Sequence, residues 1–289
     1  IKTKNTTKTE NKNSKYDRKG KNKMQNNTII TDAKDFNIKQ TLECGQLFRY
    51  TIKDNCAEVF SLDKKAVLYE NNGNIIIENE DKEYFNNYFD LNCDYSQIKT
   101  NLSGLPLMDK AIQYGYGIRI LRQDILETII SFIISANNNI PRIQGILSRI
   151  APNGKFPQLA ELACITQEDF KAMGCGYRAS YLEKTIKTLA ENKINLLSPY
   201  EMNGNDANKF LCNNLVGVGP KVADCILLFG YHKMDVFPVD TWVKKIYDDL
   251  FGISSSPKVI RQKLIETYGE NAGYAQQYLF YHKRDSSKE

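Results

Sequence analysis

The chemistry that this sequence offers centres on one lysine and one aspartate. Lys221 follows a glycine-rich turn in LVGVGPKVADC (215–225), and Asp240 stands 19 residues later in PVDTWV (238–243). A neutral lysine amine can attack C1′ of a deoxyribose and form a Schiff base. Because a helix N-terminus and burial both disfavour an ammonium, we expect the pKa of Lys221 to be lowered. An ionised Asp240 could stabilise the positive charge that develops on a sugar as its base departs.

Both residues also have ordinary structural explanations. Most lysines are exposed on the surface, and an aspartate before a helical pattern is a normal N-cap. The capping role of Asp240 is compatible with the chemical one, because a carboxylate held by backbone N–H groups stays ionised.

The turn before Lys221 predicts a helix-hairpin-helix. Helical patterns flank Gly217, Val218 and Gly219, and the two glycines are expected to let the chain turn tightly. Backbone N–H groups at the start of the next helix would then suit a phosphate oxygen, without reading base sequence. An ordinary glycine turn between two helices is the alternative.

Composition limits the classes of function. The chain of 289 residues carries a net charge of +5, but residues 1–23 contribute +7 and the remainder −2, so overall basicity is a poor argument for DNA binding. We find no signal-peptide pattern and no apolar run of the roughly 20 residues that span a bilayer. The seven cysteines form no CxxC pair, which predicts reduced thiols in a cytosolic protein, without a disulfide framework or zinc site.

The pattern along the chain predicts an α+β protein. Residues 1–27 are polar and basic and should form a disordered tail. Residues 28–121 are rich in short aromatic and β-branched runs, with an Asn-Gly turn at 72–73 and one short helix at 82–91, which indicates an antiparallel β domain. Residues 122–289 show helical patterns, introduced by a capping box of Asp124 and Glu127, and should form a helical domain.

Taken together, these motifs resemble a known family. LVGVGPKVADC followed by PVDTWV is similar to the helix-hairpin-helix, Gly/Pro…Asp superfamily of base-excision DNA glycosylases. CGQLFRY (44–50), LRQD…ISFIISANNNIPRI (121–143), GCGYRASY (174–181) and GYAQQYLF (273–280) extend the resemblance in the expected order. Within the superfamily the chain is similar to the 8-oxoguanine DNA glycosylase/AP lyases, from about residue 30 to 285.

The resemblance implies roles for individual residues. Lys221 would be the nucleophile and Asp240 the essential carboxylate. The Gly45 carbonyl would accept the N7–H that 8-oxoguanine has and guanine lacks. The remaining implied contacts to the flipped base are a sandwich by Cys225 and Phe280 and a hydrogen bond to its Watson–Crick edge from Gln276. Taken singly, Gly45 could be a turn glycine, Phe280 a core residue and Cys225 a buried thiol.

A second implied group would hold the DNA. Asn137 would fill the gap left by the extruded base, Arg142 and Arg178 would read the orphaned cytosine, and Tyr177 would wedge the stack. Alone, the asparagines of 137–139 would be read as a polar loop and GYR (176–178) as a turn.

The sequence departs from the family pattern at two places. Eukaryotic members have a histidine where this chain has Trp242, and an acidic residue where it has Lys283. These changes put phosphate contacts and rate in doubt, but leave the nucleophile and the carboxylate. No cysteine follows Cys225, which argues against the iron–sulfur branch of the superfamily.

We therefore expect a bifunctional glycosylase and AP lyase that excises 8-oxoguanine opposite cytosine and nicks the strand by β-elimination. The expected partner is damaged double-stranded DNA, with no cofactor required and no membrane, for a monomer in the cytoplasm (nucleoid-associated if prokaryotic). The alternatives are a monofunctional glycosylase for alkylated bases, which needs no lysine nucleophile, and a non-catalytic helix-hairpin-helix DNA-binding module.

Overall fold

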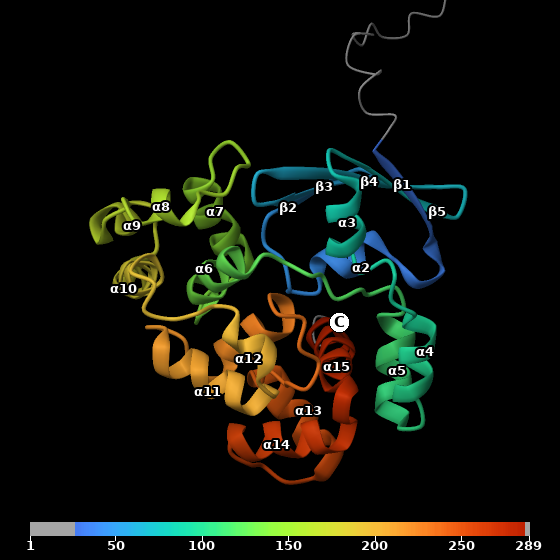
Figure 1. The fold of residues 1–289 in the computed structure, drawn as a ribbon. Coiled ribbons are helices and arrows are strands. Elements are labelled where there is room, and N and C mark those ends of the chain that lie inside the picture. Colours follow the sequence, from blue (N-terminus) through green and yellow to red (C-terminus); the bar gives the residue numbers. More distant parts are fainter. Residues whose placement is uncertain (1–26, 287–289) are drawn as a thin grey trace, which may run out of the picture.

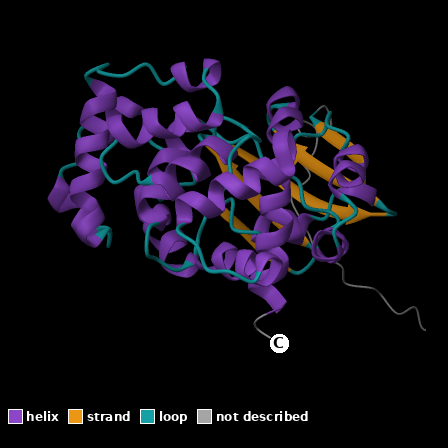
Figure 2. Cartoon of the chain, turned by 90° about the horizontal axis from the view of Figure 1, so that it is seen from below, coloured by secondary structure: helices purple, strands orange, loops and turns teal. Residues whose placement is uncertain are grey.

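A computed structural model describes residues 27–286, in which an antiparallel sheet lies at one side of a larger group of helices (Figures 1 and 2). The predicted tail at 1–27 lies outside the described residues, apart from Asn27. No helix of the described part is long and apolar enough to cross a membrane. The α+β prediction is confirmed.

Four strands of the sheet are joined by consecutive hairpins, and the first strand of the chain lies at the edge of the sheet beside the last. The order of the strands is β1-β5-β4-β3-β2, with every neighbouring pair antiparallel. The bounds are β1 (Thr28–Asp32), β2 (Tyr50–Lys53), β3 (Cys56–Ser61), β4 (Lys64–Asn71) and β5 (Asn74–Asn79).

Alternation of side chains explains how the sheet packs. In β3, Ala57, Val59 and Ser61 are buried while the residues between them are partly exposed, as expected for a sheet with one face on a core. The turn between β4 and β5 holds Asn72 and Gly73 at φ +50° and +74°, which confirms the predicted Asn-Gly hairpin.

Helices make up most of the remaining chain. Their bounds are α2 (Ile38–Glu43), α3 (Lys82–Tyr88), α4 (Tyr95–Leu102), α5 (Pro106–Tyr114), α6 (Ile125–Ser135), α7 (Ile140–Ile150), α8 (Leu159–Leu162), α9 (Gln167–Ala172), α10 (Ala179–Ala190), α11 (Gly204–Asn214), α12 (Pro220–Phe229), α13 (Thr241–Phe251), α14 (Pro257–Tyr268) and α15 (Ala272–Ser286).

The two hydrophobic cores do not follow the predicted domain boundary at 121/122. One core lies between the sheet and α3. The other, in the helical part, also takes in Tyr95, Met108 and Ile118, because α4 and α5 pack beside it and α5 contacts α15 (Figure 1). The sequence patterns did not identify α4 and α5. Part of the segment assigned to the β domain thus belongs to the core of the helices.

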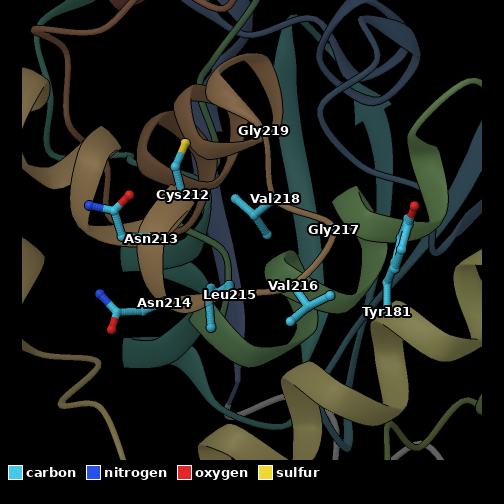
Figure 3. A pocket seen from close by; sticks show the side chains of 9 residues that line it. All are labelled: Tyr181, Cys212, Asn213, Asn214, Leu215, Val216, Gly217, Val218 and Gly219. Carbon is cyan, nitrogen blue, oxygen red and sulfur yellow. The ribbon is translucent and has the colours of Figure 1, made fainter.

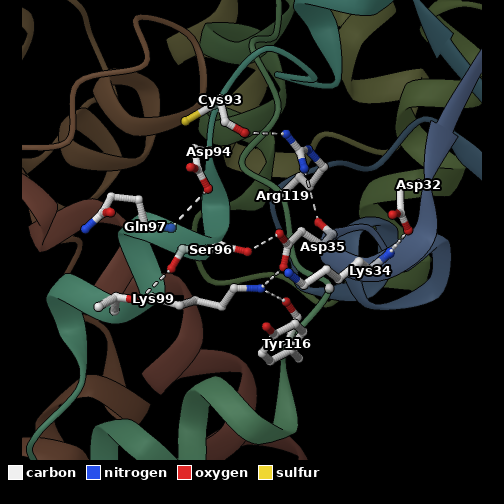
Figure 4. A network of polar contacts seen from close by, with 12 residues as sticks. Asp32, Lys34, Asp35, Cys93, Asp94, Ser96, Gln97, Lys99, Tyr116 and Arg119 are labelled. Atoms are coloured by element: carbon white, nitrogen blue, oxygen red, sulfur yellow. Dashed lines mark hydrogen bonds and ion pairs between the residues drawn. The ribbon is translucent and has the colours of Figure 1, made fainter.

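A polar network joins α4 to the N-terminal part (Figure 4). The Lys99 ammonium pairs with Asp35 and lies 3.3 Å from the ring centroid of Tyr116, while Ser96 Oγ donates to Asp35 at 2.6 Å. The buried Arg119 donates to the carbonyls of 35, 89, 90 and 93. These contacts fix α4 and the linker toward α6 relative to the sheet.

Only half of the predicted capping box at α6 is present. Asp124 accepts a hydrogen bond from the Glu127 N–H at 2.9 Å, so it caps the helix. The Glu127 side chain does not return to Asp124. It accepts from Arg49 Nη1 at 2.7 Å and from the Leu62 N–H at 2.8 Å, with both ionic side chains buried. Glu127 thus connects α6 to the sheet.

Candidate active site and DNA interface

The glycine-rich segment forms the predicted hairpin between α11 and α12 (Figure 3). Gly217 has φ +85°, and a Cβ there would lie 2.7 Å from side-chain atoms of Tyr181, which projects toward the turn from α10. Any side chain at Gly217 would therefore meet both backbone strain and a clash.

Gly219 does not have the role that the sequence suggested. Its φ and ψ of −90° and 176° are open to any residue, so the turn itself does not require this glycine. A Cβ at Gly219 would meet no atom within 4 Å. It is the N-cap of α12, so its open side leaves the first N–H groups of the helix accessible to an anion.

The candidate catalytic pair lies at the start of two successive helices. Lys221 is in the first turn of α12, and Asp240 is the N-cap of α13. One Asp240 carboxylate oxygen accepts hydrogen bonds from the N–H groups of Trp242 and Val243, both at 2.9 Å, so the capping prediction is confirmed. Burial raises the pKa of Asp240, while those N–H groups and the Lys221 charge act in the opposite direction.

The predicted lowering of the Lys221 pKa was wrong. The pKa of Lys221 is raised above its usual value by its interactions with Cys225, above all, and with Asp240, which together outweigh the effect of burial. Burial in turn raises the pKa of the Cys225 thiol to about 11. Lys221 must lose a proton before it can act as a nucleophile.

All six residues predicted for catalysis and base binding line one narrow cavity with a volume of about 40 Å³. The cavity lies where the loop before β2, the helices α6, α12 and α15, and the N-terminus of α13 meet. Its lining consists of Cys44, Gly45, Phe132, Lys221, Cys225, Phe229, Pro238, Asp240, Gln276, Gln277 and Phe280.

The base-binding candidates have the geometry of a narrow slot. Gly45 has φ +89°, and a Cβ there would lie 3.3 Å from the Phe280 ring, so a side chain would intrude on this wall. Gln276 is 5% exposed, and its Oε1 is buried without a hydrogen-bond partner among the described residues. A buried amide oxygen without a partner is costly unless a ligand supplies a donor.

The candidates for opposite-strand recognition gather between α6, α7 and α10. Asn137 is exposed with φ +50°, and the Tyr177 side chain is 55% exposed. Arg142 is also exposed, with one donor on the Gly174 carbonyl at 3.3 Å. Arg178 differs, because it is buried and donates to the Ala136 and Asn137 carbonyls. It would have to release these carbonyls to read a base.

The two residues that depart from the family pattern, Trp242 and Lys283, each contact a charged side chain of α13. The ring of Trp242 lies 4.5 Å from the Lys245 ammonium. Lys283 forms an ion pair with Asp249 at 2.6 Å, which joins α15 to α13 beside the cavity.

Two buried side chains near the cavity were not predicted from the sequence. Gln277 donates to the Cys44 carbonyl at 2.8 Å. Asp224, 1% exposed in α12, pairs with Arg261 of α14 at 2.6 Å. Asp224 could have been noticed as an acidic residue within an otherwise apolar helical pattern. Nothing in the sequence indicates Gln277 beyond its position next to Gln276.

Comparison with known proteins defines the class. Residues 28–129 match the model of the 8-oxoguanine DNA glycosylase N-terminal domain, and residues 130–269 match that of the HhH-GPD superfamily of base excision DNA repair proteins. The chain is thus a helix-hairpin-helix protein of base-excision DNA repair. The two models divide inside α6, a few residues after the predicted boundary.

Individual relatives narrow the assignment. The N-glycosylase/DNA lyase OGG1 of Arabidopsis thaliana is 36% identical over 61% of this chain and 54% of its own length. The N-glycosylase/DNA lyase of Saccharomyces cerevisiae is 30% identical over 84% of this chain and 82% of its own length. A Clostridium acetobutylicum 8-oxoguanine glycosylase/lyase, solved in complex with dsDNA containing cytosine opposite to 8-oxoG, is 38% identical with a TM-score of 0.84, covering 88% of this chain and 93% of that one.

The chain belongs to the 8-oxoguanine DNA glycosylase family, and the Arabidopsis and Saccharomyces relatives are named N-glycosylase/DNA lyases.

Proposed function

We propose that this enzyme excises 8-oxoguanine from duplex DNA opposite cytosine, with Lys221 as the nucleophile and Asp240 as the stabilising carboxylate. The single observation that carries the proposal is the cavity in which these two residues meet the candidate base-binding residues. The Clostridium relative in complex with DNA containing this base pair supports the choice of lesion and of opposite base.

The reaction begins when Lys221 loses a proton. Its neutral Nζ then bonds to C1′ while the bond from C1′ to the base breaks, and the base leaves with that electron pair and takes up a proton. Asp240 stabilises the positive charge that develops on the sugar. The sugar ring opens to a Schiff base. Loss of a C2′ proton to water then forms the C2′=C3′ double bond as the C3′–O bond breaks and the 3′ phosphate leaves with its electron pair, so the strand is nicked 3′ to the lesion.

Selection of the lesion relies on the opposite walls of the cavity. The Gly45 carbonyl accepts the N7–H of 8-oxoguanine, whereas the N7 of guanine is itself an acceptor and would oppose it. Phe280 and Cys225 enclose the flipped base, and the unpartnered Gln276 Oε1 receives a donor from its Watson–Crick edge. The cost of flipping is a few kcal/mol of unstacking.

Two kinds of contact hold the DNA. One is to its phosphate backbone, and the other is to the stack and the cytosine that the flipped base leaves behind. The N–H groups of Gly217 and Gly219 bind a phosphate of the lesion strand, while the Val218 N–H, which donates to the Leu215 carbonyl at 3.3 Å, shapes the turn between them. Asn137 and Tyr177 fill the emptied stack. Arg142 reads the cytosine, with Arg178 joining it once its carbonyl contacts are exchanged. This chemistry needs no cofactor, and we propose that the enzyme acts as a monomer, in the cytoplasm or on the nucleoid.

Borohydride trapping tests the proposal. A duplex with 8-oxoguanine opposite cytosine is incubated with the protein and reduced, which should give a covalent complex. Lys221→Gln should abolish the complex, while Lys187→Gln, at an exposed lysine of α10, should retain it. Base release without trapping would point to a monofunctional glycosylase, and binding without release would point to a non-catalytic module. Either result would overturn the assignment of Lys221.

A further inference from the structure

One side chain joins the two walls of the cavity, and the proposed reaction does not account for it. Gln277 of α15 is 2% exposed, and its Nε2 donates to the Cys44 carbonyl at 2.8 Å. Cys44 is itself fully buried and lies in the loop before β2, 233 residues away along the chain. The contact therefore ties the loop to the helix across the cavity.

The contact joins two walls of the cavity, and each wall carries groups proposed to bind the base. The Cys44 carbonyl belongs to the peptide unit that leads into Gly45, so fixing it constrains the direction of the next carbonyl. Among the described residues, none of the hydrogen bonds uses the Gly45 oxygen, which leaves it available to a ligand. On the other side, α15 carries Gln276 and Phe280.

Among the described residues, other hydrogen bonds hold the loop to the N-terminal part, and Gln277 supplies its hydrogen bond to α15, next to the Phe280 ring that lies against Gly45. Gln46 Nε2 donates to the Thr41 and Arg119 carbonyls at 2.9 and 2.7 Å, and its Oε1 accepts from the Leu121 N–H at 2.9 Å. These bonds retain the loop when Gln277 is altered. Loss of the Gln277 hydrogen bond would therefore change the alignment of the two walls more than the folding of the loop.

We propose that Gln277 is a positioning residue for lesion selection. By holding the Cys44–Gly45 peptide at a fixed distance from α15, it sets the separation between the Gly45 acceptor and the groups of Gln276 and Phe280. A base fits both walls only when its N7–H and its Watson–Crick edge match that separation. The inference rests on the proposed base contacts and deepens them.

The test compares three duplexes in a Lys221→Gln background, where binding is measured without turnover. The lesion position holds 8-oxoguanine, guanine or a tetrahydrofuran abasic analogue, each opposite cytosine. Gln277→Met, which keeps the volume but lacks the N–H donor, should reduce the affinity ratio of 8-oxoguanine to guanine by about tenfold, as expected for one buried hydrogen bond. Affinity for the abasic analogue should not change. Gln262→Met, at an exposed position of α14, is the matched control.

A second variant covers the case in which Gln277→Met does not fold. Gln277→Glu has nearly the same shape, and its carboxyl can donate to the Cys44 carbonyl only when protonated. The 8-oxoguanine preference of this variant should therefore fall as pH rises from 5 to 8.

Three results would overturn the role of Gln277. These are an unchanged preference for 8-oxoguanine in Gln277→Met, an equal loss of affinity on all three duplexes, or a preference in Gln277→Glu that equals that of the parent at every pH. If the parent itself showed no preference for 8-oxoguanine, the proposed function would fail instead, so the two failures are distinguishable.

Discussion

Substitution by alanine should affect different properties at the two glycines of the hairpin. Gly217→Ala should lower stability, whereas Gly219→Ala should weaken DNA binding. In Gly217→Ala, an alanine at φ +85° costs about 1–2 kcal/mol of backbone strain, and the contact with Tyr181 at 2.7 Å adds about 1–3 kcal/mol of overpacking. The free energy of unfolding should therefore fall by about 2–5 kcal/mol, which lowers Tm by roughly 4–20 °C at about 2–4 °C per kcal/mol.

Gly219→Ala should leave stability nearly unchanged. Its backbone is unstrained and the new Cβ meets open space, so the change in the free energy of unfolding should stay within about 0.5–1 kcal/mol. The methyl group would instead occupy the space of the phosphate and block one charge-assisted hydrogen bond. Affinity for duplex DNA should fall about tenfold, which corresponds to about 1.4 kcal/mol.

Thermal unfolding and fluorescence anisotropy on an abasic-analogue duplex measure the two effects separately. The prediction requires that Gly217→Ala change Tm more than Gly219→Ala, and that Gly219→Ala weaken binding while remaining folded. Equal losses of Tm in both variants would refute the distinction. Unaltered DNA binding in Gly219→Ala would refute the phosphate site at α12.

Three further predictions follow from the site and the charge distribution. Cys225→Ala should leave the rise of single-turnover excision with pH where it is, because a thiol with a pKa of about 11 carries no charge over the assay range; a shift of the profile to lower pH would show that Cys225 is a thiolate beside Lys221. Arg142→Ala should relax the choice of opposite base while excision continues, and identical activity ratios across the four opposite bases would contradict that role. Deleting residues 1–23 removes a charge of +7, so non-specific binding and its salt dependence should fall while excision persists; loss of excision would mean that the segment takes part in it.

Local motifs made much of the site predictable. The hairpin and the Asp240 cap depend on residues within a few positions of one another, so their spacing carried the information. The resemblance then added Gly45, Gln276 and Phe280, whose convergence on one cavity no local pattern could show.

The remaining features depend on tertiary contacts. Lys221 appeared set for a lowered pKa because only its helix position was visible, whereas Cys225 and Asp240 determine the outcome in the fold. Glu127 fitted a capping box, yet its carboxylate is used by Arg49 from another element. Arg178 fitted a base-reading role, and the carbonyls that occupy it became visible only in the structure.

The shared core of α4, α5 and α15 has a consequence for folding. Gly45 and Gln277 come from opposite ends of the described chain, so the cavity forms only after the most distant segments have met. The hairpin, in contrast, is built from α11 and α12, which are neighbours in sequence. A partly folded molecule that has formed only the hairpin therefore has the phosphate site without any place for a damaged base.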